Sequence, residues 1–178
     1  MTFRIVGERT AWRGRRIAVA VAQVEGPEGD GFEREVVHHP GAVGVVPQHD
    51  DGTVTLVRQF RAALGRDLWE VPAGLRDVTG EPPEETARRE LAEEVGLRAE
   101  RLEHLATFHN SPGFSDEAVV VYLATGLAEV PDDRQGMEER HMLVERVRLD
   151  DALDMIDDGR ITDAKTVIGL LTLARRRR

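Results

Sequence analysis

The segment GLRDVTGEPPEETARRELAEEVGL, residues 74–97, is the most informative part of this chain. Near its end, Glu90, Glu93 and Glu94 stand at positions i, i+3 and i+4, so on a helix the three carboxylates share one face. Like charges on one face repel, and this spacing is unfavourable unless a cation lies among them. Oxygen ligands with net negative charge suit Mg²⁺ or Mn²⁺ rather than zinc. The segment therefore predicts a divalent-metal site for chemistry on phosphates.

The same glutamates also fit a second interpretation, because helices rich in Glu and Arg are usually solvated faces with many ion pairs. The flanking residues favour a docked helix: Pro82 and Pro83 suit its first turn, and Gly96 suits its C-terminal cap. Directly upstream, residues 68–74 (LWEVPAG) are typical of a strand that leads into a glycine loop. An apolar stripe for docking runs beside the carboxylates and consists of Ala87, Leu91 and Val95.

Length and composition indicate an ordinary globular protein. A chain of 178 residues, of which 40% are hydrophobic, is long enough for one domain with a substantial core. The absence of cysteine excludes disulfides and thiol catalysis. The N-terminus has no apolar signal-peptide core, and no apolar run approaches the roughly 20 residues that span a bilayer. We therefore expect a cytoplasmic protein with no membrane partner.

The charge distribution argues against nucleic acid as a partner. The formal net charge is −9, whereas proteins that bind nucleic acid broadly carry a positive surface. Arg175–Arg178 form the one basic run. We interpret it as the end of a last helix, where cations complement the helix dipole. A tail that binds nucleic acid or an anionic membrane is the alternative.

The pattern along the chain predicts a mixed α/β (α+β) fold without repeats. Val54 and Leu56 alternate with threonines, as in a half-buried strand. Residues 128–140 are polar and acidic and predict a loop, and helices are expected at 150–157 and from about residue 162 onward. Strands are expected at residues 3–7, 16–24, 33–38, 41–47, 53–60, 68–72, 101–109, 118–126 and 141–148.

Residues 74–97 resemble the Nudix box, whose pattern is Gly, five residues, Glu, seven residues, then Arg-Glu-apolar-x-Glu-Glu-x-Gly-apolar. Glu81 and the run Arg89–Leu97 fit it fully, whereas six residues rather than five separate Gly74 from Glu81. We expect the additional residue to bulge in the loop without disturbing the helix. The resemblance extends over roughly residues 35–175. It implies a Nudix fold for residues 41–178, with a mixed β-sheet sandwiched between helices.

The N-terminal residues 1–40 match the family only in general character. In ADP-ribose-type Nudix proteins, such an extension forms a small antiparallel sheet that builds a dimer and completes the partner's active site. The alternating stretch IAVAVAQV needs burial on at least one face. The resemblance therefore implies an N-terminal antiparallel β extension and a homodimer.

Residues 111–117, SPGFSDE, bear on the substrate. Pro112 stands fifteen positions after Leu97, and a proline at this place resembles the ADP-ribose pyrophosphatase subfamily. The resemblance implies Mg²⁺-dependent hydrolysis of ADP-ribose to AMP and ribose 5-phosphate. A plain loop is the alternative for the segment, since Ser, Pro, Gly and Asp are turn formers. For the function, the alternatives are another nucleotide sugar such as GDP-mannose, and a non-catalytic ADP-ribose sensor, although sensors typically lose box glutamates.

The family resemblance also assigns the metal ligands. Glu90, Glu94 and the backbone carbonyl of Ala73 correspond to ligands in relatives, and Glu93 either ligates or supports catalysis. Arg89 would orient the carboxylates through charge-assisted hydrogen bonds, with Glu81 in a supporting role.

The general base and the substrate contacts are less closely fixed. Relatives bring a loop glutamate to the site, so Glu138 or Glu139 is the expected base, ahead of His109 and His141. Arg61 is preferred over Arg58 for phosphate binding, because their odd spacing places them on opposite faces of a strand. Candidates for the rest of the substrate are Glu70 for ribose or nucleoside hydroxyls, Pro112, Gly113 and Asp116 for the distal sugar, and Trp12, Phe32 and Trp69 for adenine stacking.

Overall fold

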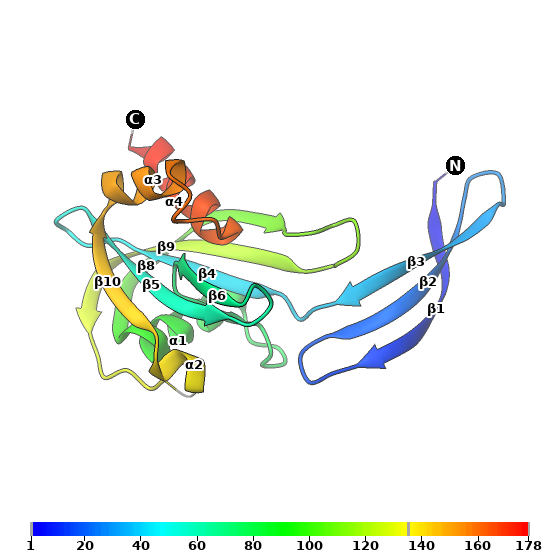
Figure 1. Cartoon of the computed structure of the whole chain (residues 1–178), viewed down its shortest axis with the longest axis horizontal. Helices are drawn as coiled ribbons and strands as arrows, with labels where there is room; N and C mark the ends of the chain where they lie inside the picture. Colours follow the sequence, from blue (N-terminus) through cyan, green and yellow to red (C-terminus); the bar gives the residue numbers. More distant parts are fainter. Residues whose placement is uncertain (1, 135, 178) are drawn as a thin grey trace. The chain divides into compact units, whose positions relative to one another are not determined.

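A computed structural model describes residues 2–134 and 136–177, without the side chain of Glu138. The chain forms two compact units, one of residues up to Gly41 with His109–Ala118, and one of the remaining residues. The elements, in chain order (Figure 1), are β1 (Arg4–Arg13), β2 (Ala18–Glu25), β3 (Gly31–His38), β4 (Ala42–Pro47), β5 (Thr53–Arg61), β6 (Arg66–Glu70), β7 (Ala73–Leu75), α1 (Pro83–Val95), β8 (Leu97–His109), β9 (Ala118–Glu129), α2 (Met137–Arg140), β10 (Leu143–Arg148), α3 (Leu149–Asp157) and α4 (Ala164–Arg176).

The larger unit is built around a mixed sheet of order β7-β4-β9-β8, in which β4 pairs antiparallel with β7 and parallel with β9. Successive side chains of β4 point to opposite faces. Val43 and Val45 pack in one core cluster with Ala87 and Leu91 of α1, whereas Val46 packs with residues of α3 and α4 in the other. Helices therefore cover both faces of the sheet, and the predicted sandwich is confirmed.

Helix α1 begins and ends where its sequence predicts. Pro82 is its N-cap residue, Pro83 follows in the first turn, and Gly96 closes it in the left-handed conformation at φ 63°. A Cβ on Gly96 would lie 2.8 Å from the carbonyl oxygen of Val130, so a side chain is excluded there on steric grounds as well. The short loop between β7 and α1 fixes where the glutamates of the helix lie.

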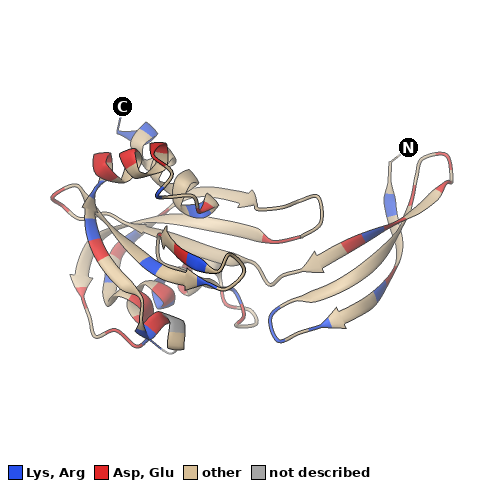
Figure 2. Ribbon diagram, viewed as in Figure 1, with Lys and Arg blue, Asp and Glu red and all other residues tan. Residues whose placement is uncertain are grey.

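A second sheet of order β10-β5-β6 completes this unit, and β5 pairs antiparallel with both neighbours. Its alternation separates Arg58 from Arg61, as expected from the sequence. Acidic residues mark much of α3 and the region of α1 and α2 (Figure 2). No helix in the part of the chain that the structure describes has the length and apolar character needed to span a bilayer.

The smaller unit contains the antiparallel sheet β1-β2-β3 and the loop that follows β8. The loop is joined to the end of β3, because the N–H of Val37 donates to the carbonyl of Phe114 and the N–H of Asp116 donates to the carbonyl of Val37. The sequence did not predict this association, which joins residues more than 70 positions apart. Exposed apolar side chains of this unit are Phe3, Ile5, Val6, Trp12 and Phe114.

Several element boundaries differ from the sequence-based prediction, and the largest differences concern β1, β8 and the loop 128–140. Strand β1 reaches Arg13 rather than residue 7, because it pairs with β2 along its whole length although nearly all its residues are exposed. Because β1 has no buried face, its sequence lacks the alternation of hydrophobic and polar residues from which a strand is predicted. Strand β8 begins directly at Leu97, and the loop expected at 128–140 contains the end of β9 and the short helix α2.

Candidate active site

The centre of the candidate site is the contact between α1 and the start of β7. Glu94 is 4% exposed, and its carboxylate accepts a hydrogen bond of 2.9 Å from the backbone N–H of Ala73. Burial raises the pKa of Glu94 to about 8, and the charges of Glu90 and Glu139 add to this effect. Burial also raises the pKa of Glu90, although Arg89 opposes the shift. Both glutamates therefore hold their protons more tightly than a solvated glutamate does.

The loop glycine of the box has a direct steric role. A Cβ on Gly74 would lie only 1.9 Å from Cδ of Glu90, so the carboxylate occupies the space that any side chain would need. Gly74 is not among the glycines with positive φ, so its backbone conformation does not itself require glycine. The close approach of the loop to Glu90 explains the need for glycine here.

We expect Gly74→Ala to lower kcat/KM about tenfold, or roughly 1.4 kcal/mol of transition-state stabilisation, because the Glu90 carboxylate must move away. The clash involves the end of a flexible side chain, so the thermal unfolding temperature should change little. Gly7→Ala is the matched control, since its Cβ would lie 3.9 Å from the nearest atom. Unchanged kinetics in Gly74→Ala would show that the position of Glu90 is unimportant.

Arg89 lies among the carboxylates. Its Nη1 donates to Glu90 Oε1 at 2.7 Å and to Glu93 Oε2 at 3.1 Å, while Nε and Nη2 donate to the carboxylate of Glu81 at 3.4 and 3.2 Å. Glu81 is itself held by the hydroxyl of Thr86 at 2.8 Å. Arg89 thus contacts the carboxylates of Glu81, Glu90 and Glu93, and its role in orienting metal ligands stays a prediction.

The donor set fits a hard divalent cation. Among the residues that the structure describes, no three acidic or histidine side chains converge as they would around an ion. The reason is visible in the contacts, because Arg89 holds Glu90 and Glu93 while the N–H of Ala73 holds Glu94. The carboxylates nevertheless share one face, and two of them have raised pKa values that a cation would reverse. Metal binding at this face would compete with Arg89.

The acidic loop brings another carboxylate to this group. The charge of Glu139, on α2, contributes to the raised pKa values of both Glu90 and Glu94. Arg134, which the sequence did not single out, fixes the loop: its Nε donates to the carbonyl of Glu94 at 3.0 Å, and its Nη1 to the carbonyl of Met142 at 3.3 Å. The side chain of the other candidate base, Glu138, lies outside the described residues.

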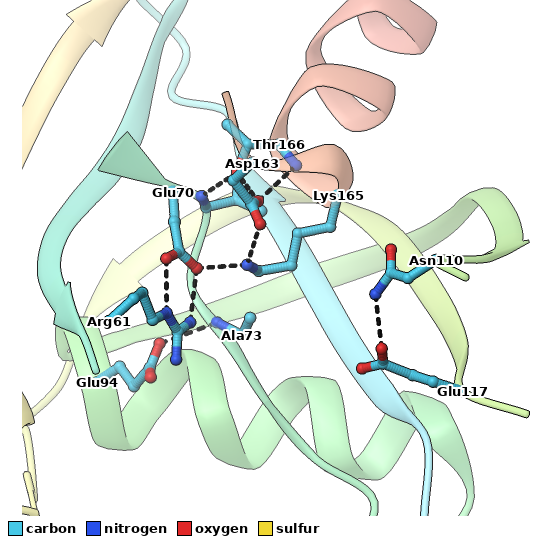
Figure 3. A network of polar contacts seen from close by, with 10 residues as sticks. Arg61, Glu70, Ala73, Glu94, Asn110, Glu117, Asp163, Lys165 and Thr166 are labelled. Atoms are coloured by element: carbon cyan, nitrogen blue, oxygen red, sulfur yellow. Dashed lines mark hydrogen bonds and ion pairs between the residues drawn. The ribbon is translucent and has the colours of Figure 1, made fainter. Parts of the chain in front are cut away.

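A network of charged groups adjoins the site (Figure 3). Glu70 is fully buried, and its two oxygens accept from Nε and Nη2 of Arg61, each at 2.6 Å. Lys165 also bonds to Glu70, and its ammonium lies 2.9 Å from Asp163. Arg58, by contrast, pairs with exposed Asp67 at 3.2 Å. With both oxygens engaged, Glu70 is better placed to hold Arg61 than to accept from a ribose hydroxyl.

Comparison with known proteins agrees with this geometry. Residues 38–168 match the NUDIX domain model. The chain belongs to the Nudix family. It is similar to the "ADP-ribose pyrophosphatase" of Mycobacterium tuberculosis, at 43% identity over 96% of this chain and 83% of the relative. It is also similar to the protein of the same name from Bacillus subtilis, at 40% identity over 94% and 90%.

Among solved structures, this Nudix chain is similar to one described as "Crystal structure of ADP compounds hydrolase". The TM-score is 0.84 and the identity 25%, and the match covers 99% of this chain and 94% of the other. The sequence-based prediction of the Nudix family and of its fold is therefore confirmed.

The loop 111–117 of this Nudix protein lies in the smaller unit. The carboxylate of Asp116 bonds to the ring of His38 at 2.6 Å and accepts from the N–H of His39 at 2.8 Å, while a Cβ on Gly113 would meet nothing within 4 Å. Asn110 donates to Glu117 at 2.8 Å (Figure 3). These contacts fix the loop on the end of β3. Substrate contact by Pro112, Gly113 and Asp116 stays a prediction.

The remaining candidates lie in different surroundings. Trp69 packs against the core of the larger unit, whereas Trp12 is exposed. Phe32 forms an edge-to-face contact with Phe3, and the guanidinium of Arg34 lies over its ring at 4.3 Å. His109 bonds through its ring to the carbonyl of Glu117 at 3.2 Å, which gives it a structural partner. None of these contacts identifies the group that stacks on a nucleobase.

Proposed function

We propose that this Nudix protein hydrolyses the diphosphate linkage of ADP-ribose and releases AMP and ribose 5-phosphate. The observation that carries the proposal is the carboxylate face of α1, whose Glu94 is buried and held by the N–H of Ala73, in a chain with ADP-ribose pyrophosphatases among its relatives at 40–43% identity. Mg²⁺, or Mn²⁺ in its place, would be held by Glu90, Glu93, Glu94 and the carbonyl of Ala73. Bound metal supplies charge neutralisation of the diphosphate and lowers the pKa of a water molecule.

The chain's own residues supply the other parts of the reaction. Glu139 is proposed to accept the proton of the attacking water, because its carboxylate acts on both Glu90 and Glu94 from the loop that Arg134 anchors. Arg61 is proposed to donate to a phosphoryl oxygen, since a guanidinium matches the geometry of phosphate. Attack of the water would break the diphosphate linkage, and one phosphoryl group would stay on each product, AMP and ribose 5-phosphate.

The experiment that tests the proposal is a panel of nucleoside diphosphate compounds assayed with Mg²⁺, with the products identified by chromatography. Production of AMP and ribose 5-phosphate from ADP-ribose supports it. A protein that binds ADP-ribose without turnover would instead be a sensor, and equal rates on all compounds would remove the ADP-ribose assignment while leaving the hydrolase.

Substrate choice gives a quantitative prediction. We expect kcat/KM for ADP-ribose to exceed that for GDP-mannose and ADP-glucose at least about tenfold, or ~1.4 kcal/mol of differential transition-state binding. Pro112 restricts its own φ and limits the paths of the loop 111–117, so Pro112→Ala should narrow the ratio without changing the Mg²⁺ requirement. Pro27→Ala, in the exposed turn between β2 and β3, is the control. A ratio that Pro112→Ala leaves unchanged would contradict a role of this loop in selecting the sugar.

We also infer that the protein is a cytoplasmic homodimer. Support for the dimer comes from the smaller unit, whose exposed Phe3, Ile5 and Trp12 would favour burial against another copy. Sedimentation of the purified protein tests the dimer directly.

A further inference from the structure

We propose that Lys165 is a positioning residue, which acts through Glu70 to hold Arg61 with one end of its guanidinium available to a phosphoryl oxygen of a nucleoside diphosphate. The inference rests on the proposed function, since it names residues that serve the same site. Lys165 stands 95 positions from Glu70 in the chain and lies in the first turn of α4. Figure 3 shows its side chain and that of Arg61 both directed at the carboxylate of Glu70.

The first step concerns the orientation of Arg61. Its Nε and Nη2 both bond to Glu70, and these two nitrogens form one edge of the planar group. Nη1 therefore points away from Glu70, and no contact of Nη1 is seen among the described residues. The Arg61 side chain as a whole is 40% exposed, so part of it is open to solvent.

The second step concerns the position of that end. Bonding to Glu70 raises the pKa of Arg61 most, and the charge of Glu94 adds to the shift. Figure 3 shows the guanidinium of Arg61 beside the side chain of Glu94, at the edge of the carboxylate face of α1. A phosphoryl oxygen bound between Arg61 and the carboxylate face would accept a hydrogen bond from Nη1 of Arg61.

The third step concerns charge. Arg61 and Lys165 together balance Glu70 and Asp163, the four groups of this network. Without the ammonium, the set would carry a net negative charge and repel the diphosphate. Oε2 of Glu70 accepts from both Arg61 and Lys165, so it would lose one of its two donors, and the orientation of Arg61 would be less firmly fixed.

A purely structural role does not explain why the buried Lys165 is charged. The N-terminus of α4 is already fixed, because Asp163 accepts from the N–H and hydroxyl of Thr166 at 3.0 and 2.6 Å, and the hydroxyl of Thr166 accepts from the N–H of Val71 at 2.8 Å. Burying an ion pair costs desolvation free energy, whereas apolar packing would stabilise the same place without that cost. The Lys165 side chain is only 11% exposed, so stability alone does not explain why a charged residue is buried here.

The residue type supports the same conclusion. Lys165 is the only lysine among the 24 Lys and Arg residues of the chain. Its stem passes over Gly44, where a Cβ would lie 3.6 Å from Cδ of Lys165. A compact ammonium fits between the carboxylates of Glu70 and Asp163, whereas a planar guanidinium would demand a different geometry.

The experiment uses the absence of cysteine from the chain. Lys165→Cys introduces a single thiol, which is alkylated in the unfolded protein with 2-bromoethylamine, to restore an ammonium, or with iodoacetamide, to give a neutral group. Both products and wild type, taken through the same steps, are refolded and assayed. We expect the neutral form and Lys165→Met to lose about tenfold in kcat/KM, mainly through KM, and the ammonium form to recover most of the loss. The Mg²⁺ concentration for half-maximal rate should not change.

A second readout is independent of turnover. The Nε–H of Arg61, bonded to Glu70, should exchange slowly with solvent in ¹⁵N NMR spectra of the wild type and at least about tenfold faster in Lys165→Met. The signal is assigned by its loss in Arg61→Lys. If Lys165→Met does not fold, Lys165→Gln takes its place, because it keeps a donor while it removes the charge. Arg146→Met, which removes the exposed pair with Asp51, is the control and should change neither readout.

Unchanged kcat/KM in the neutral forms would overturn the proposal, as would equal losses in the ammonium and neutral forms, or a loss without faster exchange at Arg61. The proposed function is tested separately by the wild type on ADP-ribose. If the wild type cleaves another compound of the panel instead, the ratio of variant to wild type is read on that compound, so the two failures are distinguishable.

Discussion

Glu94→Gln is expected to fold normally and to hydrolyse the diphosphate at least about 10³-fold more slowly than the wild type, or roughly 4 kcal/mol in transition-state stabilisation. The amide has the size of the carboxylate and still offers an oxygen to the N–H of Ala73, which the carboxylate contacts at 2.9 Å. It cannot supply the negative charge that a divalent cation requires. The rate is measured at saturating Mg²⁺, with circular dichroism to verify the fold.

The pH dependence of stability provides the control for this result. The pKa of Glu94 is raised from 4.5 to about 8, so the folded metal-free protein holds this proton more tightly than the unfolded chain does. The contribution of Glu94 to the stability of the metal-free protein is therefore lost as the pH rises from about 4.5 through 8. Because a metal ligand must be deprotonated, stabilisation by Mg²⁺ should be larger at pH 8.5 than at pH 6 in the wild type, and should lose this dependence in Glu94→Gln. Full activity in the variant would exclude Glu94 from the site.

Local sequence was sufficient to predict the helix that carries the candidate site. The prolines, the closing glycine and the spacing of Glu90, Glu93 and Glu94 all act within one helix, where the geometry repeats every 3.6 residues. Alternation along β5 likewise separated Arg61 from Arg58, because a strand has a period of two. These features depend on neighbours in the chain, and the structure has them where the sequence predicts.

The contacts that the sequence did not predict join distant segments. Lys165 meets Glu70 across 95 positions, and the loop 111–117 joins the end of β3 near Val37. No periodicity relates such residues, since their approach depends on how the elements pack. The ion pairs of Glu70 with Arg61 and Lys165 belong to this group of contacts, and a role of Glu70 toward the substrate stays a prediction.

Glu139→Gln is expected to lower kcat about 10²-fold, the lower end of the contribution of general acid–base catalysis, with KM nearly unchanged. Three features place this effect at Glu139. Its charge acts on Glu90 and Glu94, its own Oε2 accepts from the N–H of Gly136 at 3.2 Å, and Arg134 fixes the loop against the end of α1. A base acts in the transition state more than in the bound substrate, so the loss should appear in kcat.

Glu138→Gln is the matched comparison, because it removes the same charge from the neighbouring position of the same short helix. The repulsion among the carboxylates supplies a further distinction. Glu139→Gln removes one of the charges that raise the pKa of Glu94, and should therefore lower that pKa, whereas neutralisation of a distant carboxylate such as Asp150 should not. Loss of kcat in Glu138→Gln with full activity in Glu139→Gln would move the base to Glu138. Near-wild-type turnover in the double variant would place the base outside α2, and the proton of the attacking water would then need an acceptor other than this loop.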